Sequence, residues 1–211
     1  MKKWILPLLA GAFLLGLLAG CGQTGSIDKE GPEEGSPNSV QDDASNDGGT
    51  GEDSAAALGS LASFTATTVD GETFTQDDIA EKDVTVVNFW SLTCGPCIAE
   101  MPDLAAFAEA LPDNVQVVTV CLDGSLDLER TRNVLSEAGF PGVTLVAGDG
   151  DLQALCGSLL YTPTTVFADS EGTLVGEPII GGQRDLSGTF LEAVNQVLAE
   201  GGKDAVSLAD A

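Results

Sequence analysis

Histidine is absent from the 211-residue chain, and basic side chains are scarce. Without an imidazole, the chain cannot form histidine metal ligands, a Ser-His-Asp triad or a Cys-His nucleophile pair. Only 8 lysines and arginines oppose 33 aspartates and glutamates, which gives a formal net charge of −25 at pH 7. Such a surface argues against nucleic acid and anionic membrane surfaces as direct ligands. Adaptation to salt is an alternative explanation of the same charge.

The reactive side chains that remain are the five cysteines, Cys21, Cys94, Cys97, Cys121 and Cys156. Their positions along the chain therefore carry most of the functional information. The chain is long enough for one ordinary domain with appendages, because domains usually contain about 100 to 200 residues.

The first 20 residues have the pattern of an export signal. Lys2 and Lys3 supply a positive start, and the apolar run at 4–18 is short for a membrane-spanning helix. The run ends in Leu18-Ala19-Gly20-Cys21, which resembles the lipobox of bacterial lipoproteins, where cleavage precedes a cysteine that is then lipidated. We therefore expect a lipoprotein signal peptide at 1–20 and lipidation at Cys21, with an uncleaved anchor helix as the alternative. Both place the domain on the extracytoplasmic face of the cell membrane.

The segment at 21–57 is rich in Gly, Ser, Asp, Glu, Asn and Pro and has almost no large apolar side chains. Such a composition cannot offset the entropy of ordering, so we expect a disordered acidic tether. A flexible chain of that length spans roughly 30 to 36 Å.

From residue 58 the pattern becomes that of a globular domain, which we place at 58–201, with a flexible tail at 202–211. Apolar runs predict strands at 64–68, 73–74, 84–91, 115–122, 143–146, 164–168 and 173–175. Helical spacing of apolar residues predicts helices at 95–110, 127–138, 152–158 and 186–199. This alternation predicts an α/β fold with a central mixed sheet flanked by helices, in which 84–90 is a strand buried on both faces.

The run Cys94-Gly95-Pro96-Cys97 lies where a buried strand gives way to a helix. Free amides and the dipole at a helix N-terminus stabilise a thiolate, which makes Cys94 the predicted nucleophile. Cys97, about one turn later, can resolve the mixed disulfide that Cys94 forms. A structural disulfide or half of a zinc site are the alternatives. Zinc would need Cys121 and Cys156, which are 35 residues apart, so we expect no metal.

Residues 87–102, VNFWSLTCGPCIAEMP, resemble the active-site segment of the TlpA/ResA-type thioredoxin-like family of thiol-disulfide oxidoreductases. Residues 162–169, TPTTVFAD, resemble the strand that follows the cis-proline of this family. The likeness covers about 61–200 and includes the family's inserted helix and strand at 127–146. It implies a thioredoxin fold with an N-terminal β-hairpin and an inserted helix-strand unit.

The resemblance also implies site residues. Pro163 is expected to be cis, and its loop to offer backbone groups to a bound substrate strand. The substrate-binding residues implied are Thr162, Pro163, Trp90, Gly95 and Pro96. Glu100 stands at the position of a family glutamate thought to assist proton movement, and its alternative role is that of a first-turn carboxylate that favours the helix dipole.

Two positions depart from the relatives. Asn88 stands where thioredoxin has a buried aspartate, so Glu100 or a water has more of the proton transfer to perform. Thr93 stands where the family usually has tryptophan, at the rim where partners bind.

Cys121 and Cys156 remain after the other cysteines have been assigned. An exported protein tends to pair such residues, so we predict a second disulfide between them. The alternatives are two separately buried thiols and an auxiliary redox pair.

Together with the cysteine pair, the resemblance implies a membrane-anchored enzyme that reduces disulfides of exported client proteins, such as apocytochrome c, and works as a monomer without a cofactor. A membrane thiol carrier would supply the electrons. The alternatives are an oxidant that forms disulfides and a non-catalytic binding or chaperone module. A copper-delivery protein is disfavoured by the missing histidine.

Overall fold

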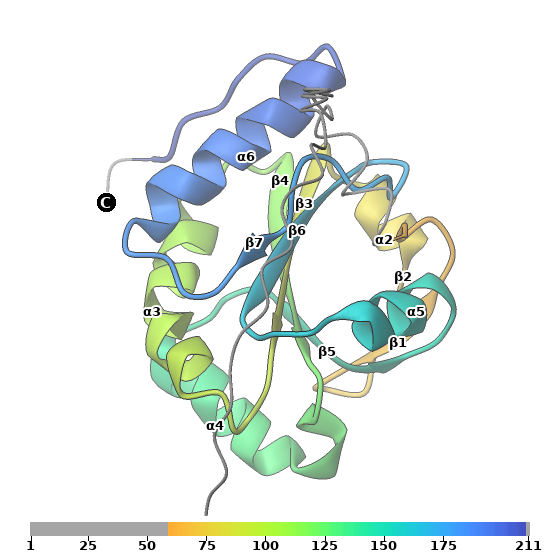
Figure 1. The fold of residues 1–211 in the computed structure, drawn as a ribbon, viewed down its shortest axis with the longest axis vertical. Helices are drawn as coiled ribbons and strands as arrows, with labels where there is room; N and C mark the ends of the chain where they lie inside the picture. Colours follow the sequence, from red (N-terminus) through yellow and green to blue (C-terminus); the bar gives the residue numbers. More distant parts are fainter. Residues whose placement is uncertain (1–58, 210–211) are drawn as a thin grey trace, which may run out of the picture. The chain divides into compact units, whose positions relative to one another are not determined.

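The computed structural model describes residues 59–209. The predicted signal peptide, the lipidation site Cys21 and the predicted tether lie outside the described residues. Within 59–209, seven strands form one mixed sheet in the order β2-β1-β5-β4-β3-β6-β7, with helices on both faces (Figure 1). The strands are β1 (Thr65–Thr68), β2 (Thr73–Thr75), β3 (Val84–Trp90), β4 (Val115–Cys121), β5 (Val143–Gly148), β6 (Thr164–Asp169) and β7 (Ile179–Ile180). The helices are α2 (Gln76–Ala80), α3 (Gly95–Ala110), η1 (Gly124–Leu126), α4 (Leu128–Ala138), α5 (Gly150–Ser158) and α6 (Leu186–Glu200).

Strand β3 lies in the interior of the sheet, and all seven of its residues are buried, as the sequence predicts. It pairs in parallel with β4 and antiparallel with β6. Alternate side chains of β3 therefore enter two separate cores. Val86 and Trp90 join the core that α3 and α6 cover, whereas Val87 and Phe89 join the core on the opposite face.

Aromatic packing fixes α3 and α6 on their face of the sheet. The Phe190 ring of α6 makes edge-to-face contacts with Phe107 of α3 and Phe167 of β6, at centroid distances of 5.8 and 5.7 Å. Such pairs add about 0.5–1.5 kcal/mol to the burial of the rings. The helix that carries the predicted dithiol therefore rests on a rigid layer.

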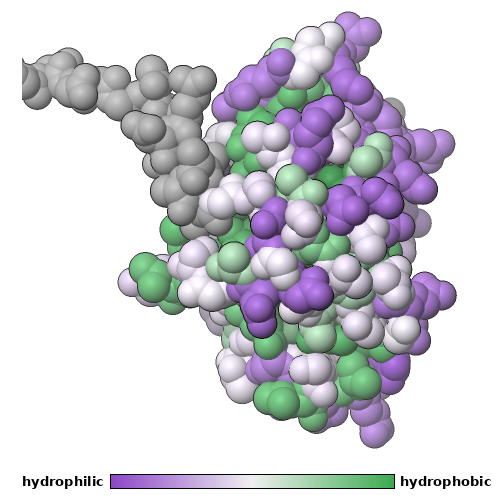
Figure 2. All heavy atoms as spheres, turned by 90° about the vertical axis from the view of Figure 1, so that its right-hand side faces the viewer, coloured by the Kyte–Doolittle hydropathy of each residue, from purple (hydrophilic) through white to green (hydrophobic). Residues whose placement is uncertain are grey.

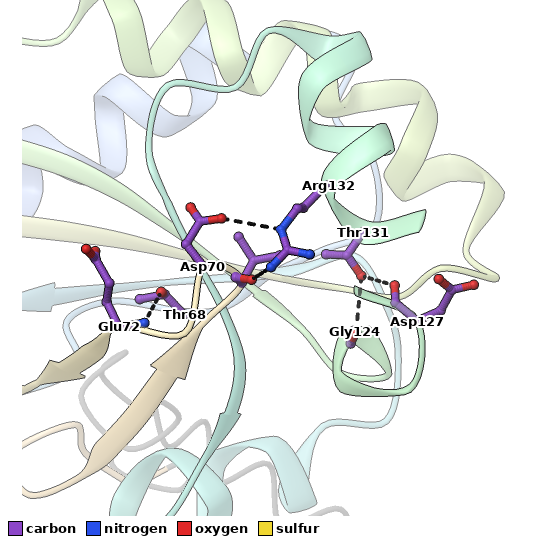
Figure 3. A network of polar contacts seen from close by, with 8 residues as sticks. Thr68, Asp70, Glu72, Gly124, Asp127, Thr131 and Arg132 are labelled. Atoms are coloured by element: carbon purple, nitrogen blue, oxygen red, sulfur yellow. Dashed lines mark hydrogen bonds and ion pairs between the residues drawn. The ribbon is translucent and has the colours of Figure 1, made fainter. Parts of the chain in front are cut away.

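The predicted N-terminal hairpin and inserted helix-strand unit are both present, as β1–β2 and as α4 followed by β5. Side chains of α4 tie these parts together (Figure 3). The Arg132 guanidinium donates to the Val69 carbonyl oxygen and pairs with Asp70 of the hairpin turn. The Thr131 hydroxyl donates to the Gly124 carbonyl of η1 at 3.3 Å. Helix α4 is thereby bonded both to the hairpin turn and to η1.

The predicted strand at 173–175 differs in the structure. Thr173 and Leu174 form only isolated bridges, and the edge strand is β7, which pairs with the start of β6. Pro178 lies between the two segments, and a proline has no N–H to continue a ladder. Helix α2 is too short to show a helical period, which is why the sequence pattern did not reveal it.

The C-terminal segment packs on the domain, so the predicted boundary at 201 is too early. The Val206 N–H donates to Asn195 Oδ1 at 2.8 Å, and Asn195 Nδ2 donates to the Val206 carbonyl at 3.1 Å. Further on, the Ala209 N–H donates to the Ala110 carbonyl at 2.9 Å. These bonds hold the segment against α6 and the end of α3, and the domain continues to at least residue 209. None of the helices within 59–209 combines the length and the apolar character needed to cross a bilayer.

Candidate active site

The dithiol lies at the junction of β3 and α3. Cys94 is the N-cap of α3, with extended backbone, and its Sγ accepts a hydrogen bond from the Cys97 N–H at 3.2 Å. Pro96 occupies an early helical position, where no N–H is needed. Cys94 and Cys97 form a disulfide with a Cα–Cα distance of 5.3 Å. The Cys94 sulfur thus occupies the place where a helix N-terminus stabilises negative charge.

The two sulfurs differ in access. Cys94 is half-buried, whereas Cys97 is 1% exposed and packs in the core beneath α3. Only Cys94 can meet a macromolecular disulfide directly. This asymmetry suits the predicted roles, with Cys94 attacking and Cys97 resolving.

Glu100 lies one helical turn after Cys97 on α3, so both side chains point to the same side of the helix. Glu100 is 8% exposed, and its Oε1 accepts from Asn88 Nδ2 at 3.4 Å. Its other oxygen, Oε2, is buried without a hydrogen-bond partner among the described residues. Burial raises the pKa of Glu100 above its usual range, against smaller opposing effects of Asn88 and the Gln183 backbone. The group is therefore poised to hold a proton.

The alternative role of Glu100 as a first-turn carboxylate is wrong. Helix α3 begins at Gly95 and has no acidic residue in its first turn. Stabilisation by the helix dipole would also lower the pKa of Glu100, whereas the pKa is raised.

Thr165 is a member of this site that the sequence analysis missed. Asn88 Nδ2 also donates to Thr165 Oγ1 at 3.0 Å, because Asn88 and Thr165 are directly paired between β3 and β6. Both are polar residues inside apolar strands, and this polarity is the feature of the sequence that could have pointed to them. The pairing could only be inferred once the register of the two strands was known.

The proline loop lies at the same edge of the sheet as the dithiol. The Thr162–Pro163 peptide bond is cis, which confirms the prediction. Thr164 pairs with Phe89, so the loop adjoins the end of β3. The Pro163 carbonyl accepts from the Gly181 N–H at 2.8 Å, whereas Thr162 makes no backbone hydrogen bond within 59–209. A backbone site next to the proline is therefore open.

The predicted contact of Trp90 with substrate is wrong. Its side chain is fully buried in the core beneath α3, and Nε1 has no hydrogen-bond partner within the described part of the chain. The alternation of β3 explains this position, because residue 90 points to the same face as Val86. Gly95 and Pro96, in contrast, are exposed.

Exposed large hydrophobic side chains gather at the edge of the sheet that carries the dithiol. Three follow the end of β4, and three lie before β6 or on its partner β7. They are Leu122, Leu126, Leu128, Leu160, Tyr161 and Ile180, and we call them the apolar rim. Hydrophobic side chains are also visible at the lower end of the face in Figure 2, the end at which Figure 1 places the start of α4. Exposed apolar surface of this kind often marks a site of interaction with another polypeptide.

Cys121 and Cys156 are free, so the predicted disulfide between them is absent. Cys121 packs in the core beneath α3, whereas Cys156 of α5 packs against the core on the other face. They border the same small cavity beyond β4 and β5 but approach it from opposite faces of the sheet.

Neither free thiol is activated. Burial, aided by the Asp123 carboxylate, raises the pKa of Cys121 to about 12, and burial also raises the pKa of Cys156. An auxiliary redox pair needs a thiolate, so the alternative of two separate thiols fits better, with Cys121 buried as expected and Cys156 half-buried. Within 59–209, no group of three or more Cys, Asp and Glu is arranged to hold a metal ion.

Comparison with known proteins agrees with this geometry. A model of the AhpC/TSA family matches residues 59–176. The thiol:disulfide interchange protein HelX of Rhodobacter capsulatus is 28% identical over 102 residues, which are 48% of this chain and 55% of HelX. The chain thus matches about half the length of this relative.

Two solved structures share the fold. One is a thiol:disulfide interchange protein from Chlorobium tepidum, with 23% identity, a TM-score of 0.55 and coverage of 66% of this chain and 96% of that one. The other is the thioredoxin domain of an oxidoreductase from Bacteroides vulgatus, with 23% identity, a TM-score of 0.53 and coverage of 65% and 97%. These similarities establish a thioredoxin-like fold.

Proposed function

Because the chain belongs to the AhpC/TSA family, we propose that it is a TlpA/ResA-type thiol-disulfide oxidoreductase that reduces disulfides of exported proteins through Cys94 and Cys97. The observation that carries this proposal is the asymmetric pair at the N-terminus of α3. Cys94 is accessible and its Sγ accepts a backbone N–H, whereas Cys97 lies buried behind it.

The reaction begins from the reduced dithiol. The Cys94 thiolate attacks one sulfur of a client disulfide, the client S–S bond breaks, and the client thiolate that leaves takes up a proton. Cys97 then gives up its proton and attacks Cys94 Sγ, which releases the second client thiol. Two electrons pass to the client, and the product on the protein is the Cys94–Cys97 disulfide present in the structure.

Glu100 supports the second step. Its buried Oε2 has no hydrogen-bond partner in the described region, and the residue lies one turn from Cys97 on α3. A carboxyl group with a raised pKa can accept the Cys97 proton and pass it on. Asn88 donates to this carboxyl group and is itself held by its hydrogen bond to Thr165.

The client would bind as an extended segment next to the cis-proline. The open backbone groups of Thr162 can pair with such a segment, which gives binding with little sequence selectivity. The apolar rim would contact hydrophobic side chains of the client. Segments that expose both cysteines and apolar residues, as in unfolded exported proteins such as apocytochrome c, are the substrates we expect.

The direction of electron flow is proposed from the Gly-Pro pair between the cysteines, which resembles reducing thioredoxin. A membrane thiol carrier would return two electrons to the disulfide after each turnover. Reduction potentials of such pairs span about −270 mV for thioredoxin to about −120 mV for strong oxidants. A measured potential near the upper value would make the protein an oxidant instead.

The proposed location is the extracytoplasmic face of the cell membrane, with lipid attached at Cys21. Cys21→Ala should release the protein from the membrane fraction of cells that express the full chain. Retention of that variant in membranes would favour the uncleaved anchor helix.

Insulin reduction by the full chain, with dithiothreitol as electron source, tests the enzyme. Wild type should accelerate insulin precipitation, and Cys94→Ser should not. In cells, Cys97→Ser should trap clients as mixed disulfides on Cys94, while Cys121→Ser, the matched control, traps none. If Cys97→Ser traps no client and Cys94→Ser retains its biological function, the protein is a binding module and not an exchange enzyme.

A further inference from the structure

Both backbone polar groups of Leu92, two residues before Cys94, are held by side chains from outside the active-site loop. Asp123 Oδ1 accepts from the Leu92 N–H at 2.8 Å. Arg130 Nη2 donates to the Leu92 carbonyl at 2.9 Å. Asp123 follows β4 and Arg130 belongs to the inserted helix α4, so two segments outside the active-site loop hold the backbone that leads to Cys94.

The position of Arg130 is unfavourable for the helix itself. It is the third residue of α4, where the positive end of the helix dipole disfavours a cation. The described residues include five basic side chains. Of these, only Arg132 and Lys203 form ion pairs with a carboxylate in the described part of the chain. In a strongly acidic protein, Arg130 thus lies at a backbone carbonyl beside the dithiol and not at a carboxylate.

Two hydrogen bonds to the backbone of Leu92 are well placed to fix the active-site loop. Its side chain is 5% exposed and belongs to the core beneath α3. The Cys94 N–H donates to the Ser91 carbonyl at 3.1 Å and closes a turn around Leu92. Holding Leu92 therefore sets the direction in which the chain enters α3, and with it the place of the Cys94 sulfur.

We propose that Asp123 and Arg130 are positioning residues of the dithiol, and that the Arg130 cation also favours the thiolate of Cys94 in the reduced protein. The proposal deepens the proposed function and rests on it for its biological role. Long-range attraction to a guanidinium strengthens as the surroundings lose water, so the effect is largest when a client covers the site.

Arg132 offers a matched control on the same helix. It lies two residues after Arg130 but is directed at the Val69 carbonyl and Asp70 in the hairpin turn (Figure 3). Arg130→Gln and Arg132→Gln change the net charge equally, and only the first removes the contact with Leu92.

The test is a titration of Cys94 in the reduced full chain, followed by the pH dependence of its alkylation with iodoacetamide. Arg130→Gln should raise the pKa of Cys94 by about half a unit, which lowers the thiolate fraction by up to about threefold at a pH below that pKa. Arg130→Lys, which keeps the charge, should restore most of this loss. Arg132→Gln should titrate like wild type.

Equilibration with glutathione gives a second measure. Loss of thiolate stabilisation destabilises the reduced form, so Arg130→Gln should shift the equilibrium roughly threefold toward the disulfide. Circular dichroism and the continued protection of Cys121 from alkylation would show that the variants are folded. Equal titration of Arg130→Gln and Arg132→Gln would overturn the proposal. Because no client is used, failure of wild type to reduce insulin would refute the proposed function without touching this result.

Discussion

Cys94 and Cys121 lie at the ends of neighbouring strands and have opposite chemical environments. Cys121 is paired with Trp90, and Cys94 follows Trp90 by four residues. Cys94 is half-buried and accepts a hydrogen bond from a helix N-terminal N–H. Cys121 is 1% exposed and lies near the Asp123 carboxylate, with its Sγ 3.5 Å from Oδ1.

From this difference we expect reactivity to depend on what surrounds the sulfur and not on which edge of the sheet it occupies. A helix N-terminus favours the thiolate, whereas burial beside a carboxylate disfavours it. Asp123 links the two environments, because the same oxygen that disfavours a Cys121 thiolate holds Leu92 before Cys94.

The largest expected effect is on turnover. Cys94→Ser should reduce insulin disulfides no faster than the reductant alone, because the hydroxyl cannot form the mixed disulfide. Cys121→Ser should keep at least about half of the wild-type rate, since its thiol takes no part in exchange. Loss of turnover in both variants would mean that Cys121 belongs to the redox site.

The second-largest effect is expected on the rates at which Cys94 and Cys121 are alkylated in the reduced, folded protein. With a pKa of about 12, Cys121 is about one part in 10⁵ thiolate at pH 7. Cys94 should therefore react with iodoacetamide at least about a thousandfold faster. Mass spectrometry of peptides after timed quenching measures both rates, with urea-unfolded protein as the control in which all thiols react. Similar rates in the folded protein would contradict the assigned environments.

Glu100→Gln should have a smaller effect, of about tenfold or more on turnover near neutral pH, because an amide cannot accept the Cys97 proton. The free energy of unfolding provides a second readout. The pKa of Glu100 is raised in the folded protein, so this residue stabilises the fold fully below about pH 4.5. That stabilisation is lost as the pH rises through the raised pKa.

Urea unfolding across this pH range should show that loss in wild type and not in Glu100→Gln. The pKa of Asp83 is lowered by its hydrogen bonds with Lys203 and Asn114, so its contribution to the free energy of unfolding is lost as the pH falls below its ordinary pKa of 3.8. This contribution is the same in wild type and in Glu100→Gln. Parallel pH profiles of the two proteins would mean that Glu100 is not the buried acid.

The smallest expected effect is on stability. Cys121→Ser places a hydroxyl in the core beneath α3 and should lower the free energy of unfolding by about 1–2 kcal/mol. Cys156→Ser, at a half-buried position on α5, should lower it by less. Urea denaturation measures both, and a larger loss for Cys156→Ser would contradict the burial assigned to the two thiols.

Much of the fold was predictable because its pattern is local. The helix at 95–110 agrees with α3 at both ends, and β3 shows as a continuous apolar run. The edge region after β6 was not predictable, since two short segments there compete to pair with one strand. The packing of 203–209 on α6 depends on Asn195 and on the Ala110 carbonyl, both distant in sequence.

The residues of the site also divide into those that the sequence could predict and those that it could not. Spacing and helix capping identified Cys94, Cys97 and Pro96, and the family resemblance located Pro163 and Glu100. Trp90 was misassigned because a sequence does not state to which face a strand residue points until the helix above it is placed. Thr165 and Arg130 were missed because strand register and helix packing bring them to the site.

By itself, the sequence determined that this acidic, histidine-free protein carries a cysteine pair at a helix N-terminus, since charge, spacing and capping are properties of neighbouring residues. The tertiary structure alone decided which other groups serve that pair. It buried Glu100 against Asn88, packed Cys121 and Cys156 against cores on opposite faces of the sheet, and brought Asp123 and Arg130 to Leu92. These relations depend on strand order and on the face each side chain occupies, which are set by the packing of the whole domain.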